Sequence, residues 1–165
     1  MAAHSSQVVD PARGFLRHTL ATLAYRAGKS LRDCPETFAD FSSGERGRTP
    51  AQILAHMCDL MDWALSICVG KQAWNDSRPQ AWAADVERFH SAMQALDDYL
   101  ASDASLGDEP GHIFQGALAD ALTHTGQLNM LRRMAGCPVK GENYYRAEIV
   151  AGRVGPEQAA ARREF

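Results

Sequence analysis

The segment from Thr49 to Gly70 carries the clearest helix signal in this chain, and it strongly limits what the chain can fold into. It begins with Thr-Pro-Ala-Gln, in which Thr49 and Gln52 form a capping box and Pro50 takes the first helical position. Gly70 follows the last apolar residue, as is common after a helix C-terminus. Between these ends, apolar residues recur at helical spacing at Ile53, Leu54, Met57, Leu60, Met61, Ala64, Leu65 and Cys68. A helix over about 50–69 with so broad an apolar face must bury that face against other helices.

Three other segments show the same three- and four-residue spacing of apolar residues. They predict helices over about 11–32, 79–100 and 113–135. Asp10 and Pro11 mark the start of the first of these helices, and Gly136 marks the end of the last. No segment shows the alternation that is typical of a β-strand. Four helices joined by breaker-rich loops predict an all-α fold, an up-down four-helix bundle.

The chain length indicates a single domain. With 165 residues, 45% of them hydrophobic, the chain can form one sizeable core but hardly two. We expect one domain over residues 1–165, with the bundle core at about 11–136 and a partly ordered C-terminal strap at 137–165. Within the strap, Tyr144, Tyr145 and Arg146 either help to cover an open end of the bundle or line a substrate mouth or a dimer contact.

Charge and hydropathy narrow the classes of partner. The formal net charge of -3 gives no basic footprint for nucleic acid or for an anionic membrane, so small-molecule or protein partners are expected. The first residues lack a charged start followed by an apolar run, and no stretch approaches the roughly 18 apolar residues of a membrane span. We therefore expect a cytoplasmic protein that binds neither nucleic acid nor membrane.

The four cysteines predict free thiols in a reducing compartment. Cys34, Cys58, Cys68 and Cys137 show neither C-x-x-C spacing nor a dense framework. Cys58 and Cys68 fall on one predicted helix, about 15 Å apart by the rise per residue. A disulfide needs a Cα separation of roughly 6 Å, so these two cannot pair with each other.

The last predicted helix carries the main candidate site. Asp120, His124 and Gln127 lie four and three residues apart, on one face of that helix and beside its apolar stripe. A carboxylate and an imidazole near a core need partners. A divalent metal ion is one shared partner that accepts oxygen and nitrogen ligands together. The alternative is that the carboxylate orients a core histidine by a hydrogen bond.

A metal site needs a third ligand, and His56 is the best candidate. Ile53 and Leu60 flank it on the helix at 50–69, so His56 borders the core, where it is either a ligand or a satisfied core histidine. His90 lies beside the apolar stripe of its helix and is a weaker candidate for a ligand or base. His18 lies off its stripe, and His112 is expected only to accompany the start of the last helix.

Several segments resemble the DinB/YfiT-like four-helix bundle proteins. The resemblance lies in RTPAQILAHMCDLMDWAL, with its central histidine, and in DALTHTGQLNMLRRMAG, with its His-x-Gly-Gln run. PVKGENYYRAEI and GRVGPEQ also look familial. Together these segments cover roughly residues 48–158, with a gap through the third predicted helix. The resemblance implies a four-helix bundle that binds a metal ion.

In the resembling family, a divalent metal is typically held by one histidine of the second helix and an H-x-x-x-H pair of the fourth. His56 matches the first of these ligands and His124 matches the second histidine of the pair, whereas Asp120 replaces the other histidine. The related mycothiol-dependent maleylpyruvate isomerases likewise have a carboxylate among the ligands. We expect zinc, with nickel as the usual purification substitute, and Gln127 as a group that hydrogen-bonds a ligand or the bound water.

The resemblance implies an enzyme whose metal activates a low-molecular-weight thiol and transfers it to, or isomerises, a small-molecule substrate. A metal-dependent hydrolase is expected on the same grounds. The alternative is a non-catalytic metal-binding or stress-associated protein with the same bundle and a closed site. A homodimer is also expected, because the family forms dimers and because Trp74, Tyr144 and Tyr145 are large side chains beyond what four helices need.

Overall fold

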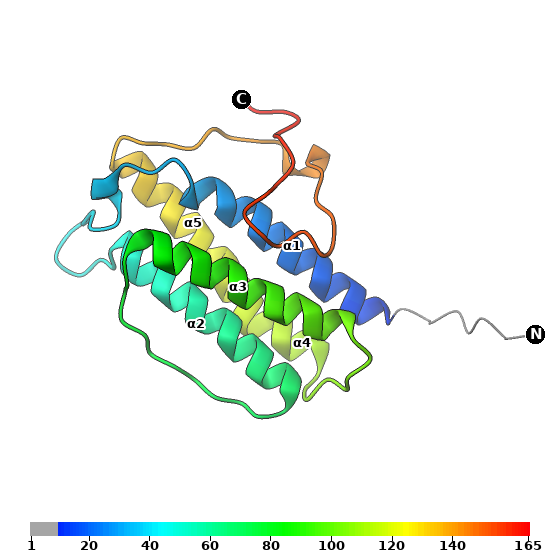
Figure 1. Cartoon of the computed structure of the whole chain (residues 1–165). Helices are drawn as coiled ribbons and strands as arrows, with labels where there is room; N and C mark the ends of the chain where they lie inside the picture. Colours follow the sequence, from blue (N-terminus) through cyan, green and yellow to red (C-terminus); the bar gives the residue numbers. More distant parts are fainter. Residues whose placement is uncertain (1–9) are drawn as a thin grey trace, which may run out of the picture.

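The computed structural model describes residues 10–165, which form four long helices around one apolar core (Figure 1). Three of them are α1 (Pro11–Leu31), α2 (Pro50–Val69) and α3 (Trp82–Ala101). The fourth is a continuous rod of α4 (Pro110–Ile113), a π-helical segment (Phe114–Leu118) and α5 (Ala119–Met134). Across residues 10–165 there is one isolated β-bridge and no strand. The all-α four-helix bundle expected from the sequence is therefore confirmed.

The helices do not alternate in direction, so the up-down order expected from the sequence is wrong for one pair of neighbours. α3 and α5 each pack against both α1 and α2. The indole N–H of Trp82 at the start of α3 donates to the carbonyl of Leu31 at the end of α1, at 3.3 Å. The loop after α3 meets the end of α2, where the N–H of Gly107 donates to the carbonyl of Cys68 at 2.8 Å. α3 thus runs antiparallel to α1 but parallel to α2, because the loop over residues 70–81 returns along the length of the bundle (Figure 1).

The predicted caps of the first two helices are confirmed. Asp10 accepts a hydrogen bond from the N–H of Ala12 at 3.0 Å, so it caps α1. Thr49 and Gln52 form the capping box of α2, with bonds of 3.3 and 2.9 Å. Gly70 ends α2 in the left-handed conformation at φ 77°. These local signals place both ends of α2 where the sequence predicted them.

The third and fourth helices differ from their predicted bounds. α3 begins at Trp82 and not near 79, because the carboxylate of Asp85 accepts the N–H of Gln80 at 2.8 Å and the chain before Trp82 stays extended. The fourth helix begins at Pro110, three residues before the predicted start, and its regular part ends at Met134. Its π-helical segment was not predicted.

The C-terminal strap lies over α1 and α3 (Figure 1). Glu142 of the strap is buried, and it accepts the phenol of Tyr25 at 2.7 Å and the ammonium of Lys29 at 2.8 Å. Further along, Val154 is fully buried in the core and its carbonyl contacts Nδ1 of His90 at 3.1 Å. The strap is therefore held along the side of α1 and α3 by one buried ionic contact and one apolar anchor, whereas the sequence analysis expected it to cover an open end of the bundle.

One helix passes a length and hydropathy test for a membrane span. Pro50–Val69 reaches a mean hydropathy of 1.2 over its most apolar 18-residue window. The sequence analysis expected no segment with the length and hydropathy of a membrane span, and this expectation was wrong for Pro50–Val69. In the structure, 61% of that window is buried inside the bundle, which is the behaviour of a core helix in a soluble protein.

All four cysteines lie in the described part of the chain, and all are free thiols, as predicted. Burial raises the pKa of Cys58 to about 12 and that of Cys68 to about 11. Both α2 thiols are therefore protonated near neutral pH and behave as core side chains.

Candidate metal centre

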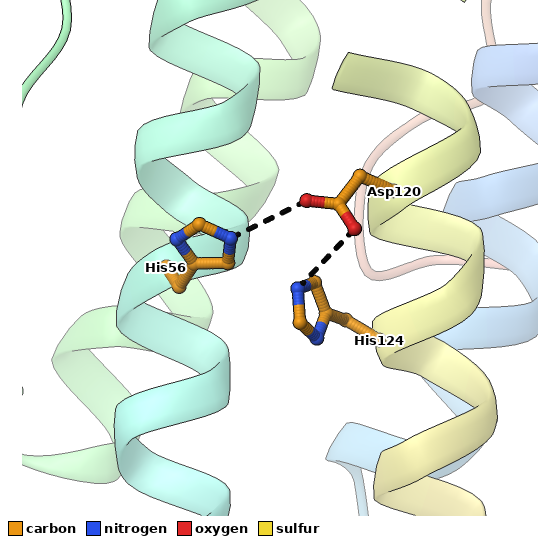
Figure 2. A group of neighbouring side chains, drawn as sticks. All are labelled: His56, Asp120 and His124. Carbon is orange, nitrogen blue, oxygen red and sulfur yellow. Dashed lines mark hydrogen bonds and ion pairs between the residues drawn. The ribbon is translucent and has the colours of Figure 1, made fainter. Parts of the chain in front are cut away.

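His56, Asp120 and His124 meet in the space between α2 and α5 (Figure 2). Nε2 of His56 lies 3.4 Å from Oδ2 of Asp120, and Nε2 of His124 lies 3.5 Å from Oδ1 of the same carboxylate. One ligand atom from each residue lies within 4.8 Å of the other two. The three predicted ligands therefore form one compact group that could hold a metal ion.

Local helix geometry accounts for this convergence. Asp120 and His124 are four residues apart on α5, so they project from successive turns of one side. His56 lies in the first half of α2, on the border of its apolar face. The start of α2 meets the end of α5, because the two helices pack in opposite directions (Figure 1). That antiparallel pairing sets His56 opposite the α5 pair.

The spacing of the three side chains suits a small divalent ion. A tetrahedral ion with metal–ligand distances of about 2.1 Å has edges of about 3.4 Å between its ligand atoms. The two contacts of Asp120, at 3.4 and 3.5 Å, match such edges. The two histidines contact different oxygens of Asp120. If one ion is bound by a single oxygen of this carboxylate, the side chain of Asp120 must rotate slightly. Two imidazoles and one carboxylate are an ordinary ligand set for catalytic zinc.

Gln127 determines which nitrogen of His124 is free. Its side-chain oxygen lies 2.7 Å from Nδ1 of His124. An amide oxygen only accepts, so in this orientation Nδ1 carries the proton and the Nε2 of neutral His124 presents a lone pair. Nε2 of His124 lies 3.5 Å from Oδ1 of Asp120, and Nε2 of His56 lies 3.4 Å from the other oxygen of that carboxylate. An imidazole nitrogen without a proton and a carboxylate oxygen are both groups that bind divalent metal ions.

The group is partly shielded from water. The exposed fraction of the side chain is 9% for His124, 20% for His56 and 46% for Asp120. Burial lowers the pKa of His56 below its ordinary value, and the neighbouring His124 and Arg48 act in the same direction, whereas Asp120 opposes them. His56 is thus held as the neutral imidazole, which is the form that binds metal.

Trp74 packs against His56, and Trp63 packs against Trp74. The ring of Trp74 packs edge-on to His56 at a centroid distance of 5.5 Å and to Trp63 at 5.8 Å. The sequence suggested Trp74 as a dimer contact and gave it no place at the site. Buried Asp59 is the signal that could have shown it, because a carboxylate on the apolar face of α2 needs partners. Ser77 of the Trp74 loop supplies them at 2.8 and 2.7 Å.

The three other histidines within residues 10–165 lie outside the group. His90 contacts the carbonyl of Val154 in the strap, and His18 is exposed. His112 pairs with Asp108 at 2.9 Å, with the same four-residue spacing as Asp120 and His124, but both side chains are exposed. Within residues 10–165, the His56 group alone has three ligand atoms close enough for one ion. An Asp-x-x-x-His pair by itself is therefore common, and the third residue sets the site apart.

A pocket of about 450 Å³ lies beside the group and opens to solvent. It is formed by the loop before α2, the first turns of α2 and the second half of α5. The lining residues are Ser43, Gly47, Arg48, Ile53, His124, Gln127, Met130, Leu131 and Met134. Tyr144, Tyr145 and Arg146 are not among them, so the strap does not line the mouth of this pocket.

Comparisons with protein-family models, with curated proteins and with solved structures found no match for this chain. Its function therefore has to be inferred from its own residues and their geometry. The strongest feature for that inference is the group of His56, Asp120 and His124 beside a solvent-accessible pocket.

Proposed function

We propose that this protein binds one divalent metal ion, with zinc as the first candidate and nickel as its usual purification substitute, through His56, Asp120 and His124. The observation that carries the proposal is the convergence of three possible ligand atoms, all within 4.8 Å of one another. Gln127 contacts Nδ1 of His124, whose Nε2 lies 3.5 Å from one oxygen of Asp120, and Nε2 of His56 lies 3.4 Å from the other. A metal ion satisfies all three groups at once.

The proposed activity is that of a small-molecule enzyme, a metal-dependent thiol transferase or isomerase, or a hydrolase. Three protein ligands leave a coordination position open, and a bound zinc ion lowers the pKa of a thiol or water held there. Gln127 would fix the ring of His124, and Trp74, which packs against His56 and Trp63, would limit water on one side of His56. The resemblance to DinB/YfiT-like proteins supports the same activity.

The pocket favours this enzyme over a non-catalytic metal-binding protein. A site that only stores or senses metal needs no coordination position that a small molecule can reach. Here the side chain of His124 reaches the group on one side and lines an open pocket on the other. A small molecule in that pocket would lie next to the ion.

Metal content is the first test. Tag-free protein loaded with zinc and desalted should retain about one equivalent by elemental analysis, which also distinguishes zinc from iron, nickel or manganese. His56→Ala and His124→Ala should retain less than about a tenth of an equivalent while staying helical, because the bundle is held by its apolar core. The matched control is His112→Ala, which breaks the other Asp-x-x-x-His pair and should retain as much zinc as wild type.

Equal zinc content in wild type, His56→Ala and His124→Ala would overturn the metal site. If the site stands, the zinc-loaded protein is tested with low-molecular-weight thiols and a chromogenic electrophile. Thiol consumption that depends on zinc and is lost in His124→Ala would support the thiol transferase. Zinc binding without any thiol or ester turnover would favour the non-catalytic alternative.

A further inference from the structure

The pocket beside His124 has an apolar part and a charged part. Ile53, His124 and Leu131 are buried and form its floor. Met130 and Met134 are about half exposed and form one rim, four residues apart on α5. Methionine side chains are flexible and polarizable, so they adapt to apolar ligands of different shape. The floor and this rim therefore suit an apolar body of moderate size.

Another part of the pocket lining carries a positive charge. Arg48 lines the pocket and, among the residues the structure describes, no carboxylate lies within ion-pair distance of its guanidinium. No aspartate or glutamate is among the lining residues either. Arg48 also directly precedes Thr49, the N-cap of α2, and the N-terminal end of a helix favours negative charge. In a chain with a net charge of -3, this is a local site for an anion.

The size of the pocket fits a small molecule. Its volume of about 450 Å³ lies within the range of about 300–1,000 Å³ that is usual for small-molecule sites. Few polar groups line it besides Arg48, namely Ser43, His124 and Gln127. A ligand that fills it needs an apolar body and one anionic group, since a guanidinium binds a carboxylate through two parallel hydrogen bonds.

We propose that this pocket binds an amphipathic organic monoanion, a carboxylate with an apolar alkyl or aryl body, whose carboxylate pairs with Arg48 and whose body lies on Ile53, Leu131, Met130 and Met134. This inference deepens the proposed metal function by naming its substrate class, and it rests on that function only for the placement of the ligand next to an ion. Binding itself depends on Arg48 and the apolar walls, so the two proposals can fail separately.

The test uses three ligands that share the same eight-carbon chain and differ in their polar group, namely octanoate, octan-1-ol and octylamine. All are used below the concentrations at which they form micelles. Binding is measured by calorimetry and by the ¹³C-methyl NMR shifts of Met130 and Met134, on both EDTA-treated and zinc-loaded protein. Octanoate should bind most tightly, and its binding should shift both methyl signals. Octylamine should bind at least about tenfold more weakly, because its charge opposes that of Arg48.

The decisive variant is Arg48→Gln, with Arg46→Gln as the matched control. Arg46 is an exposed arginine two residues earlier that does not line the pocket. Arg48→Gln should weaken octanoate at least about tenfold and leave octan-1-ol unchanged, Arg48→Lys should recover part of the loss, and Arg46→Gln should bind like wild type.

Equal octanoate affinity in wild type and Arg48→Gln, or methyl shifts absent from Met130 and Met134, would overturn this proposal whatever the metal content. Arg48-dependent octanoate binding in a protein that retains no zinc would support the pocket and overturn the metal function. Arg48-dependent binding together with zinc retention, with octanoate affinity changed by the metal, would support both.

Discussion

At the scale of single residues, the candidate site contains one hydrogen bond that connects a proposed metal ligand to the surface. Gln127 is exposed, yet its oxygen accepts from Nδ1 of buried His124 and leaves Nε2, which lies 3.5 Å from Asp120, without a proton. Groups of this kind commonly change metal affinity by about 10- to 100-fold when they are removed. Whether Gln127 acts in this way is still a prediction.

We expect Gln127→Ala to weaken zinc binding by about 10- to 100-fold, because the ring of His124 loses its orientation. Gln127→Glu keeps an acceptor beside Nδ1 and should bind zinc at least as tightly as wild type. Gln115→Ala removes an exposed glutamine earlier in the same rod and serves as the control. Competition with a chromophoric chelator measures all four affinities. An unchanged affinity in Gln127→Ala would assign Gln127 a packing role only.

His90 gives a pH-dependent contribution to stability. It is buried, and burial lowers its pKa from the ordinary value of 6.5, although the hydrogen bond to the carbonyl of Val154 opposes the shift. The unfolded chain therefore takes up a proton at a higher pH than the folded one does. The stability that neutral His90 contributes is fully present above pH 6.5 and is lost as the pH falls through the folded pKa.

His90→Asn keeps a donor for the Val154 carbonyl and removes the titration. Metal-free wild type should lose more thermal stability than His90→Asn between about pH 7.5 and about pH 5.5. His56 titrates in both proteins, so its effect cancels in the comparison. Parallel melting curves for the two proteins at both pH values would show that His90 does not titrate as described.

At the scale of elements, the sequence predicts best where a helix end is decided by its own residues. α2 keeps both predicted ends, because Thr49, Gln52 and Gly70 act within one turn of the chain. The start of α3 was missed, because it depends on Asp85 reaching back to Gln80. The same limit applies at the site. Asp120 and His124 follow from helical spacing and His56 was a candidate because it borders the core, but Trp74 depends on the contact between Ser77 and Asp59.

The loop between α3 and α4 depends on a close approach of two glycines. A Cβ on Gly107 would lie 2.4 Å from both Cα and N of Gly70, which are backbone atoms that cannot move aside cheaply. Gly107→Ala should therefore destabilise the protein by about 1–3 kcal/mol. Gly111 in α4 has open space around it, so Gly111→Ala should be neutral or stabilising by up to about 1 kcal/mol. Urea denaturation of both variants measures the difference, and equal stabilities would contradict the close approach.

At the scale of the whole molecule, the strap and the bundle form one unit. The contact between Lys29 and Glu142 is almost fully buried, with side-chain exposures of 6% and 0%. Breaking a buried pair by removing one partner typically costs about 3–5 kcal/mol, so the strap is bound firmly to α1. The strap lies on α1 and α3, and the metal group lies between α2 and α5. The strap therefore adds to stability without covering the site.

We also propose that the chain forms a homodimer, as the resemblance implies. Trp74 is 48% exposed and Tyr145 is 96% exposed, so both remain free to contact a second copy, whereas Tyr144 packs against Tyr25 of α1. Light scattering should return twice the chain mass of 18.0 kDa. A mass near 18.0 kDa over a wide concentration range would exclude the dimer.

The π-helical segment also determines where the chain can change length. In a regular helix each residue turns the chain by about 100°, so a deletion between Asp120 and His124 would swing one ligand away from His56. A π turn contains one residue more than the α turn that it replaces. Loss of exposed Gln115 would convert Phe114–Leu118 to an ordinary α turn and leave the angular phase of α5 unchanged. One residue can therefore be lost from this turn while Asp120 and His124 still project toward His56.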